Sequence, residues 1–422
     1  MSDPASRADR RDFITKLSTL AVGAGALAGV TAAAPAAEAA ESDAPLKAGP
    51  PVLQNPTSTS MAVAWSVDQA ATGFVEYGET PELGSKAYAP ENGLNPLNSR
   101  FLQARITGLT PGNKIYYRTV TTPIQFANAY KIVAGEPIQG EVYEFRTPSA
   151  EPTAASFAVL NDTHEKLEVL QAATGQLAAE PADLTVWNGD IFNDIRSDDQ
   201  IIAQVLRPAD APFAAQRPVL YTSGNHDVRG VHARALSQAM IEWPDQKGLG
   251  RNFAVRQGPL ALVGLDTGED KPDAHPVFAG LANFEPYREA QGAWLAEALQ
   301  RADIATAPYL VVFCHIPLWG RPGDNPGDTL EGYASYCRQA QRAWHPHLAK
   351  AGAQLLVCGH THRFRYDEPN DQRAYGQIVG GGPSLSGGTI IRGKADEKTL
   401  TVTATSLDGK GLGEWRIPPR QG

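Results

Sequence analysis

Five short motifs contain the residue types that bind metal ions and move protons. In chain order they are Asp162-Thr163-His164, Gly189-Asp190, Gly224-Asn225-His226-Asp227, His315 and Gly359-His360-Thr361-His362. Carboxylate, imidazole and amide ligands suit Zn, Fe and Mn, and the lack of a thiolate in the motifs argues against a structural zinc site. Five of the nine histidines lie in these motifs. The motifs therefore predict a transition-metal centre.

Each motif follows an apolar run that is typical of a buried strand. The runs cover residues 157–160, 184–187, 218–221, 309–313 and 354–357. Because open α/β sheets form their sites where strands end and loops begin, we expect the motifs to meet in space. Glycine before Asp190, Asn225 and His360 permits tight turns and close backbone approach. Any one of these residues alone could be a turn or capping residue, but the combination indicates one site.

The strands alternate with helical patterns over residues 152–420, which predicts a domain of buried sheets covered by helices. We expect helices at residues 165–179, 288–301 and 330–350, and further short strands at residues 389–415. Residues 45–150 instead show period-two alternation, with turn residues and no helical pattern, which is typical of a small β-sandwich. The predicted chain is an N-terminal β-sandwich followed by an α/β domain.

Composition excludes several classes of protein. With 42% hydrophobic and 20% charged residues, the 422-residue chain has the composition of a folded globular protein. A net charge of -9 and the lack of a long basic run argue against a nucleic-acid-binding surface. Three cysteines, Cys314, Cys337 and Cys358, are too few for a disulfide scaffold. Buried free thiols are expected, with a disulfide between Cys314 and Cys358 as the alternative.

The first 40 residues have the organisation of an export signal. Arg10-Arg11-Asp12-Phe13-Ile14 precedes an apolar stretch at residues 17–34 that is rich in Ala and Gly, and Ala37-Glu38-Ala39 follows. The arginine pair resembles a twin-arginine signal, although Lys16 comes one place late. A transmembrane anchor is the alternative, but the stretch is short and weakly apolar. We expect a periplasmic or secreted protein without a membrane anchor after signal removal.

The β-rich segment resembles a fibronectin type III domain, and more narrowly the N-terminal domain of purple acid phosphatases. Trp65 in an early strand and Gly108-Leu109-Thr110-Pro111-Gly112 before a Tyr-rich strand are the basis of this resemblance. The tyrosine expected six places after Leu109 is Ile115 here. Tyr116 or Tyr117 would have to supply any equivalent hydrogen bond.

The five motifs together resemble the calcineurin-like metallophosphoesterases, over roughly residues 157–379. The resemblance implies a four-layer αββα fold and a centre of two divalent or trivalent ions of Fe, Zn or Mn. It assigns Asp162, His164, Asp190 and His362 to one ion, and Asp190, Asn225, His315 and His360 to the other. His226 would bind the phosphoryl group or protonate the leaving oxygen, and Asp227 would orient His226. Asn193 stands where purple acid phosphatases have a metal-binding tyrosine, so a tyrosinate-coloured ferric site is not expected.

These features predict an exported phosphoesterase that acts on small phosphate monoesters through a metal-bridging hydroxide. The alternatives are a phosphodiesterase acting on a nucleotide or lipid headgroup, and a non-catalytic binding protein. Residues 228–250 and 267–286 are expected to form the pocket walls that decide the substrate. Arg229 is either a substrate contact or an ordinary exposed arginine. The other histidines, His232, His275, His345 and His347, are expected to be structural.

Overall fold

The computed structural model describes residues 45–151, 154–208, 213–244, 246, 248–321 and 332–420. The predicted export signal at residues 1–40 lies outside this part of the chain. Across the residues that are described, no helix combines the length and the apolar character needed to cross a membrane.

The first nine strands form two facing sheets. They are β1 (Val52–Thr57), β2 (Ser60–Ser66), β3 (Ala71–Gly78), β4 (Ser85–Ala87), β5 (Phe101–Thr107), β6 (Lys114–Asn128), β7 (Lys131–Ala134), β8 (Ile138–Gln139) and β9 (Tyr143–Arg146). Strands β1, β2 and β5 lie in one sheet; β3, β4 and β6 form the other, where β6 also pairs with β7, β8 and β9. Trp65, Leu102, Ile115 and Phe145 are buried in their common core. The predicted β-sandwich is confirmed, although β1 is not evident from the sequence pattern.

The rest of the chain alternates strands with helices and ends in three antiparallel strands. The elements are β10 (Ala155–Leu160), α1 (Leu167–Ala179), β11 (Leu184–Asn188), α2 (Asp198–Ile201), η1 (Ile202–Leu206), β12 (Val219–Thr222), η3 (Ala233–Gln238), β13 (Phe253–Gln257), β14 (Leu260–Leu265), η4 (Pro276–Phe278), α3 (Phe284–Ala298), α4 (Ala302–Ala305), β15 (Tyr309–Cys314), α5 (Gly332–Lys350), β16 (Leu355–Cys358), β17 (Arg365–Asp367), β18 (Gly376–Val379), β19 (Thr389–Ala395), β20 (Leu400–Ser406) and β21 (Gly411–Ile417).

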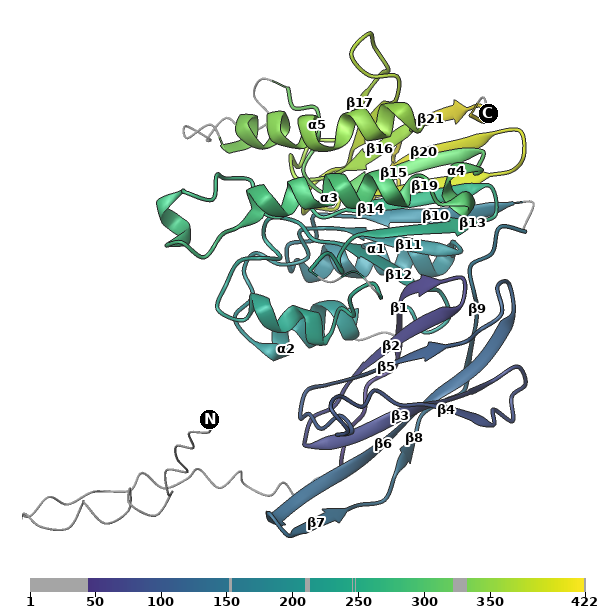
Figure 1. The fold of residues 1–422 in the computed structure, drawn as a ribbon, viewed down its shortest axis with the longest axis vertical. Coiled ribbons are helices and arrows are strands. Elements are labelled where there is room, and N and C mark those ends of the chain that lie inside the picture. The colour runs from purple at the N-terminus through teal and green to yellow at the C-terminus, as the bar shows by residue number, and fades with distance from the viewer. Residues whose placement is uncertain are drawn as a thin grey trace, which may run out of the picture. The chain divides into compact units, whose positions relative to one another are not determined.

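Two sheets stack face to face, and helices cover their outer faces (Figure 1). One sheet has the order β21-β20-β19-β10-β11-β12-β1-β2-β5, and the other has the order β13-β14-β15-β16-β18-β17. Between the sheets, Phe157 packs against Phe313 with 5.6 Å between the ring centroids. A second apolar core joins the first sheet to α1, and a third joins the other sheet to α3 and α5. This arrangement confirms the predicted four-layer αββα architecture.

The nine-stranded sheet connects the N-terminal strands to the α/β region. Strand β1 runs parallel to β12, with Gln54 opposite Val219. The buried hydroxyl of Tyr117 donates a 2.7 Å hydrogen bond to the carbonyl of Ala215, in the α/β region. Tyr117 therefore supplies a tyrosine hydrogen bond, as expected, but its acceptor lies in the α/β region and not in the sandwich. The predicted boundary between a domain at residues 45–150 and a domain at residues 152–420 stays a prediction, because the nine-stranded sheet contains strands from both segments.

Two helix starts differ from the sequence pattern for identifiable reasons. Helix α1 begins at Leu167 instead of residue 165, because Glu165 has a φ of 59°, which no right-handed helix can include. Helix α3 begins at Phe284, four residues before the predicted start. The carboxylate of Asp273 accepts hydrogen bonds from the backbone N–H groups of Phe284 and Glu285 at 2.8 and 2.9 Å. This cap comes from eleven residues upstream, so a local sequence signal does not reveal it.

Candidate metal centre

The predicted ligands lie at strand ends, on a backbone that few side chains adopt. Five of them have φ between 45° and 72°, in the left-handed region: Asp162, His164, Asp190, His360 and His362. Among the described residues, only five other non-glycine positions share this feature. Such conformations cost about 1–3 kcal/mol each and concentrate at functional sites. The turns thus hold the ligands in an orientation that ordinary loops avoid.

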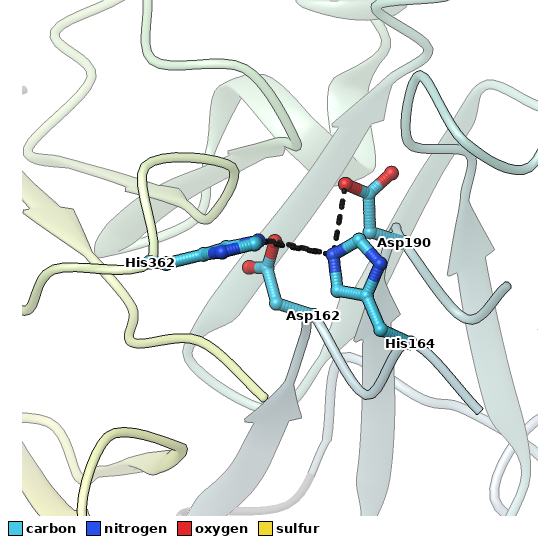
Figure 2. Close-up of side chains that lie close together, drawn as sticks. All are labelled: Asp162, His164, Asp190 and His362. Atoms are coloured by element: carbon cyan, nitrogen blue, oxygen red, sulfur yellow. Dashed lines mark hydrogen bonds and ion pairs between the residues drawn. The ribbon is translucent and has the colours of Figure 1, made fainter. Parts of the chain in front are cut away.

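Four side chains form the first ligand group, and Figure 2 shows them pointing toward one another. They are Asp162, His164, Asp190 and His362, and one ligand atom from each lies within 4.8 Å of the others. Nε2 of His164 is 3.0 Å from Nε2 of His362 and 3.4 Å from Oδ2 of Asp190. Nε2 of His362 is 3.3 Å from Oδ1 of Asp162. The structure therefore brings together all four residues assigned to the first ion.

The second group shares Asp190 with the first. Asp190, His315 and His360 place their ligand atoms within 4.8 Å of one another. Asn225 belongs with them, because its Oδ1 lies 2.9 Å from Nδ1 of His360. Only Asp190 occurs in both groups, and its side chain is 1% exposed. All seven predicted ligands thus converge, with one carboxylate positioned between two sites.

The hydrogen bonds of the rings test whether these groups suit a cation. Nδ1 of His315 donates to the carbonyl of Asn188 at 2.8 Å, which leaves a lone pair on Nε2 in the neutral ring. That Nε2 lies 3.1 Å from Oδ2 of Asp190, yet it is buried without a hydrogen-bond partner. Two acceptors that face each other in a buried site repel unless a proton or a metal ion lies between them. The residues therefore fit a bound metal ion.

The carboxylates also attract positive charge strongly. Burial alone would raise the pKa of Asp162 and of Asp190, but the neighbouring histidines outweigh burial and hold both pKa values below the ordinary range. Conversely, burial lowers the pKa of His164 and His315, but the two carboxylates overcome it and raise each pKa to about 10. A site that binds protons this tightly between its ligands provides the negative potential that a multivalent cation needs.

His226 is held beside the ligands in a defined neutral form. Its Nδ1 lies 2.7 Å from the carbonyl of Asn193, which can only accept, and Nη1 of Arg229 lies 3.2 Å from its Nε2. Because the guanidinium can only donate, Nδ1 carries the proton and Nε2 the lone pair. Burial lowers the pKa of His226, and the positive charge of Arg229 contributes, although Asp190 opposes them. Arg229 is therefore part of the site and not an ordinary exposed arginine.

Asp227 supports the site differently from the role that the resemblance implies. Its Oδ1 accepts from the N–H groups of Ile191 and Phe192 at 2.9 and 3.2 Å, and its Oδ2 accepts from Gly224 at 2.9 Å. Among the described hydrogen bonds, none joins Asp227 to the His226 ring. The carboxylate instead fixes the loop that follows Asp190. Burial and the charge of Asp190 raise the pKa of Asp227 to about 6.

Two asparagines that the motifs do not include also build the site. Nδ2 of Asn188 donates to the carbonyls of Cys314 and Val357 at 3.2 and 3.1 Å, and the Thr222 hydroxyl donates to its Oδ1 at 2.6 Å. Asn188 thereby joins both sheets beneath the ligands. Asn161 donates to the carboxylate of Asp162 and to the carbonyl of Gly381. In the sequence, Asn188 directly precedes Gly189-Asp190 and Asn161 directly precedes Asp162. This position next to a motif is the sequence signal that could have identified them.

Asn193 contacts the predicted ligand His164 but belongs to neither ligand group. The side-chain oxygen of Asn193 accepts from Nδ1 of His164 at 3.1 Å, and the side-chain amide nitrogen of Asn193 donates to the backbone carbonyl of His164 at 3.2 Å. The position that carries tyrosine in purple acid phosphatases therefore orients His164 here.

Glycine is required where the strand ends come together. Gly189 has a φ of 82°, and a Cβ there would lie 2.5 Å from Nδ1 of the predicted ligand His315. A Cβ at Gly359 would collide with the carboxylate of Asp162. These two glycines allow the ligand-bearing loops to approach each other.

The remaining histidines and the cysteines lie outside both ligand groups. His345 hydrogen-bonds to the Tyr375 hydroxyl at 3.0 Å, and His275 accepts from the N–H of Val277. Cys314, Cys337 and Cys358 are buried free thiols, and Sγ of Cys314 lies 3.7 Å from Sγ of Cys358. The disulfide alternative is therefore not found.

Comparison with known proteins agrees with this geometry. Residues 155–364 match the Calcineurin-like phosphoesterase family. The chain is 23% identical over 319 residues to "Probable purple acid phosphatase 20" of Arabidopsis thaliana, which covers 72% of this chain and 65% of that protein. The three curated relatives that it matches are each covered over less than two thirds of their length, at 65%, 42% and 62%.

Two solved structures share the fold. Purple acid phosphatase PPD1 from yellow lupin (Lupinus luteus) has a TM-score of 0.64 at 15% identity, over 87% of this chain and 74% of that one. A structure of PhoD has a TM-score of 0.57 at 13% identity, over 88% of this chain and 92% of that one. With the matched residues 155–364 containing every predicted ligand, the chain contains a domain of the calcineurin-like phosphoesterases, a family of metal-dependent hydrolases.

Proposed function

We propose that the protein hydrolyses small phosphate monoesters at a centre of two metal ions. The main support is that two ligand groups share Asp190, with their ligand atoms within 4.8 Å of one another in each group. The phosphatase names of the curated relatives support a phosphomonoester over a diester. The two ligand groups with a shared carboxylate argue against the alternative of a non-catalytic binding protein, which would not need them.

The protein's own groups determine how an ester would be held. Bound metal ions would supply positive charge for the phosphoryl oxygens and a more acidic water. Asp162 and Asp190 would hold those ions, because both carboxylates are buried and their pKa values lie below the ordinary range, so they are ionised at neutral pH. The backbone N–H of His226 donates to Oδ1 of Asp190 at 2.9 Å, and Arg229 contacts the His226 ring, so both residues lie beside the candidate ligands. The Arg229 guanidinium is anchored by Glu269, with two contacts of 2.7 Å, so its orientation is set before a substrate arrives.

Metal analysis combined with a panel of phosphate esters tests this proposal. We expect close to two transition-metal ions per chain and faster hydrolysis of a phenyl monoester than of the corresponding diester. A protein without bound metal that Zn, Mn and Fe all fail to activate would contradict the dinuclear centre. A faster rate on the diester would favour the phosphodiesterase alternative. Since Asn193 replaces the tyrosine, the iron-loaded protein should also lack a tyrosinate absorption band.

We further propose that the twin-arginine route exports the protein. The support is the sequence Arg10-Arg11-Asp12-Phe13-Ile14 before an apolar stretch. Changing Arg10→Lys together with Arg11→Lys should retain the protein in the cytoplasm, as measured by cell fractionation. The matched control is Arg7→Lys, which lies outside the pair and should leave export unchanged. Unaffected export of the double variant would indicate the general secretory route.

A further inference from the structure

A cavity of about 610 Å³ is lined in part by Arg229, the residue that contacts the His226 ring. Its walls come from residues 228–234, residues 269–284 and Arg251, which fall within or next to the two segments expected to form the pocket walls. Arg229 lines this cavity and also lies 3.2 Å from Nε2 of His226. Because the backbone N–H of His226 donates to Oδ1 of Asp190 at 2.9 Å, the cavity lies next to the candidate metal centre, with Arg229 at the boundary between them.

One wall of the cavity is apolar and partly open to solvent. Val277, Phe278, Leu281, Ala282 and Phe284 contribute to it, around the short helix η4. Val277 and Leu281 are 66% and 72% exposed. Grouped, exposed apolar side chains at the mouth of a cavity are typical of a surface that binds an apolar ligand.

The charged groups of the cavity are already paired or hydrated. Arg229 contacts Glu269 and lies 3.0 Å from Asp270, and Nζ of Lys271 lies 2.6 Å from the same Asp270 carboxylate. Arg251 donates to the Ser223 hydroxyl. Arg234 is exposed, so water screens its charge. The surface that remains available for a ligand is therefore mainly the apolar wall.

We propose that this cavity binds the leaving group of the substrate, and that the preferred substrates are phosphate monoesters of bulky aromatic alcohols. This inference rests on the proposed phosphatase function. In the reaction, a water oxygen bonds to phosphorus, the bond from phosphorus to the ester oxygen breaks, and a water proton passes to the departing oxygen. The products are inorganic phosphate and the aromatic alcohol, whose ring system packs against Leu281 and Phe278.

Phenyl phosphate and 2-naphthyl phosphate test the subsite, because their leaving groups have similar acidity and differ mainly in apolar size. We expect kcat/KM to be about ten-fold higher for the naphthyl ester, the effect of extra apolar volume in a fitted pocket. Leu281→Ser should lower kcat/KM for the naphthyl ester several-fold more than for the phenyl ester. Val277→Ser, on the same wall, should act in the same direction.

Leu94→Ser is the matched control, since Leu94 is 74% exposed and lies in the N-terminal region. It should leave both esters unaffected, and melting temperatures should show that all three variants fold. A wild-type naphthyl to phenyl ratio near one, or an equal ratio in Leu281→Ser and Leu94→Ser, would overturn the subsite while the phosphatase function stands. Failure to hydrolyse either ester with metal bound would instead overturn the proposed function, and the subsite with it.

Discussion

Asn188→Ala should destabilise the whole fold although Asn188 binds no metal in our assignment. The side chain is fully buried and makes three hydrogen bonds, two to carbonyls of β15 and β16 in one sheet and one from Thr222 in the other. Alanine would remove all three. The carbonyl of residue 188 would remain, so the hydrogen bond from Nδ1 of His315 should survive.

The expected loss follows from these contacts. Each net hydrogen bond contributes about 1 kcal/mol, so three account for roughly 3 kcal/mol. The Thr222 hydroxyl would also remain buried without its acceptor, which adds about 1 kcal/mol or more. We therefore expect the free energy of unfolding to fall by roughly 4 kcal/mol. Thr222→Val, nearly equal in size, removes only one of the bonds and should cost about 1–2 kcal/mol.

Urea unfolding with a chelator present measures both variants without a contribution from bound metal. The double variant should show a coupling energy of about 1 kcal/mol, because the two side chains share one hydrogen bond. A loss below about 1 kcal/mol for Asn188→Ala, or one equal to that of Thr222→Val, would refute the role of Asn188 as the link between the sheets.

Three further substitutions separate metal binding, chemistry and stability. Asp190→Ala should lose both metal ions and all activity together, because Asp190 belongs to both ligand groups, and metal analysis that finds one retained ion would contradict sharing. His226→Ala should keep its metal but lose about 10²–10⁴ in turnover, the usual contribution of a positioned acid or base. His226 can donate a proton only after its Nε2 has taken one up; if it acts in this way, the loss should shrink for esters with acidic leaving groups, and an equal loss across esters would assign His226 to binding. Tyr117→Phe should lower the free energy of unfolding by about 1–2 kcal/mol by leaving the Ala215 carbonyl without its donor, whereas Tyr116→Phe, for which no side-chain hydrogen bond is described, should change it by less than about 0.5 kcal/mol.

The ligands could be predicted because each one follows a strand whose apolar character is visible in the chain. Asp190 after residues 184–187 and His315 after residues 309–313 are local signals, and the parallel sheets bring them together. A sheet covered by helices was predictable for the same reason, since continuous apolar strands require cover on both faces, whereas the second sheet layer followed only from the family resemblance.

The remaining features depend on partners that are distant in sequence. Nothing near Asp227 shows that its carboxylate binds the loop after Asp190, 35 residues upstream, instead of the adjacent ring. The start of α3 depends on Asp273, and the pairing of β1 with β12 joins residues 54 and 219. Arg229 could only be left open, because its role depends on Glu269 and Asp270.

The left-handed backbone of the ligand residues has a consequence for how such a chain changes under selection. Asp162, His164, Asp190, His360 and His362 occupy conformations that glycine would adopt with little strain. A lineage released from the need to bind metal could therefore gain stability by exchanging these residues for glycine. At these five positions the residue needed for activity lowers stability, whereas at Asn188 the same side chain favours both stability and activity. Drift in an inactive descendant should accordingly erase the ligands early and retain the asparagine that joins the sheets.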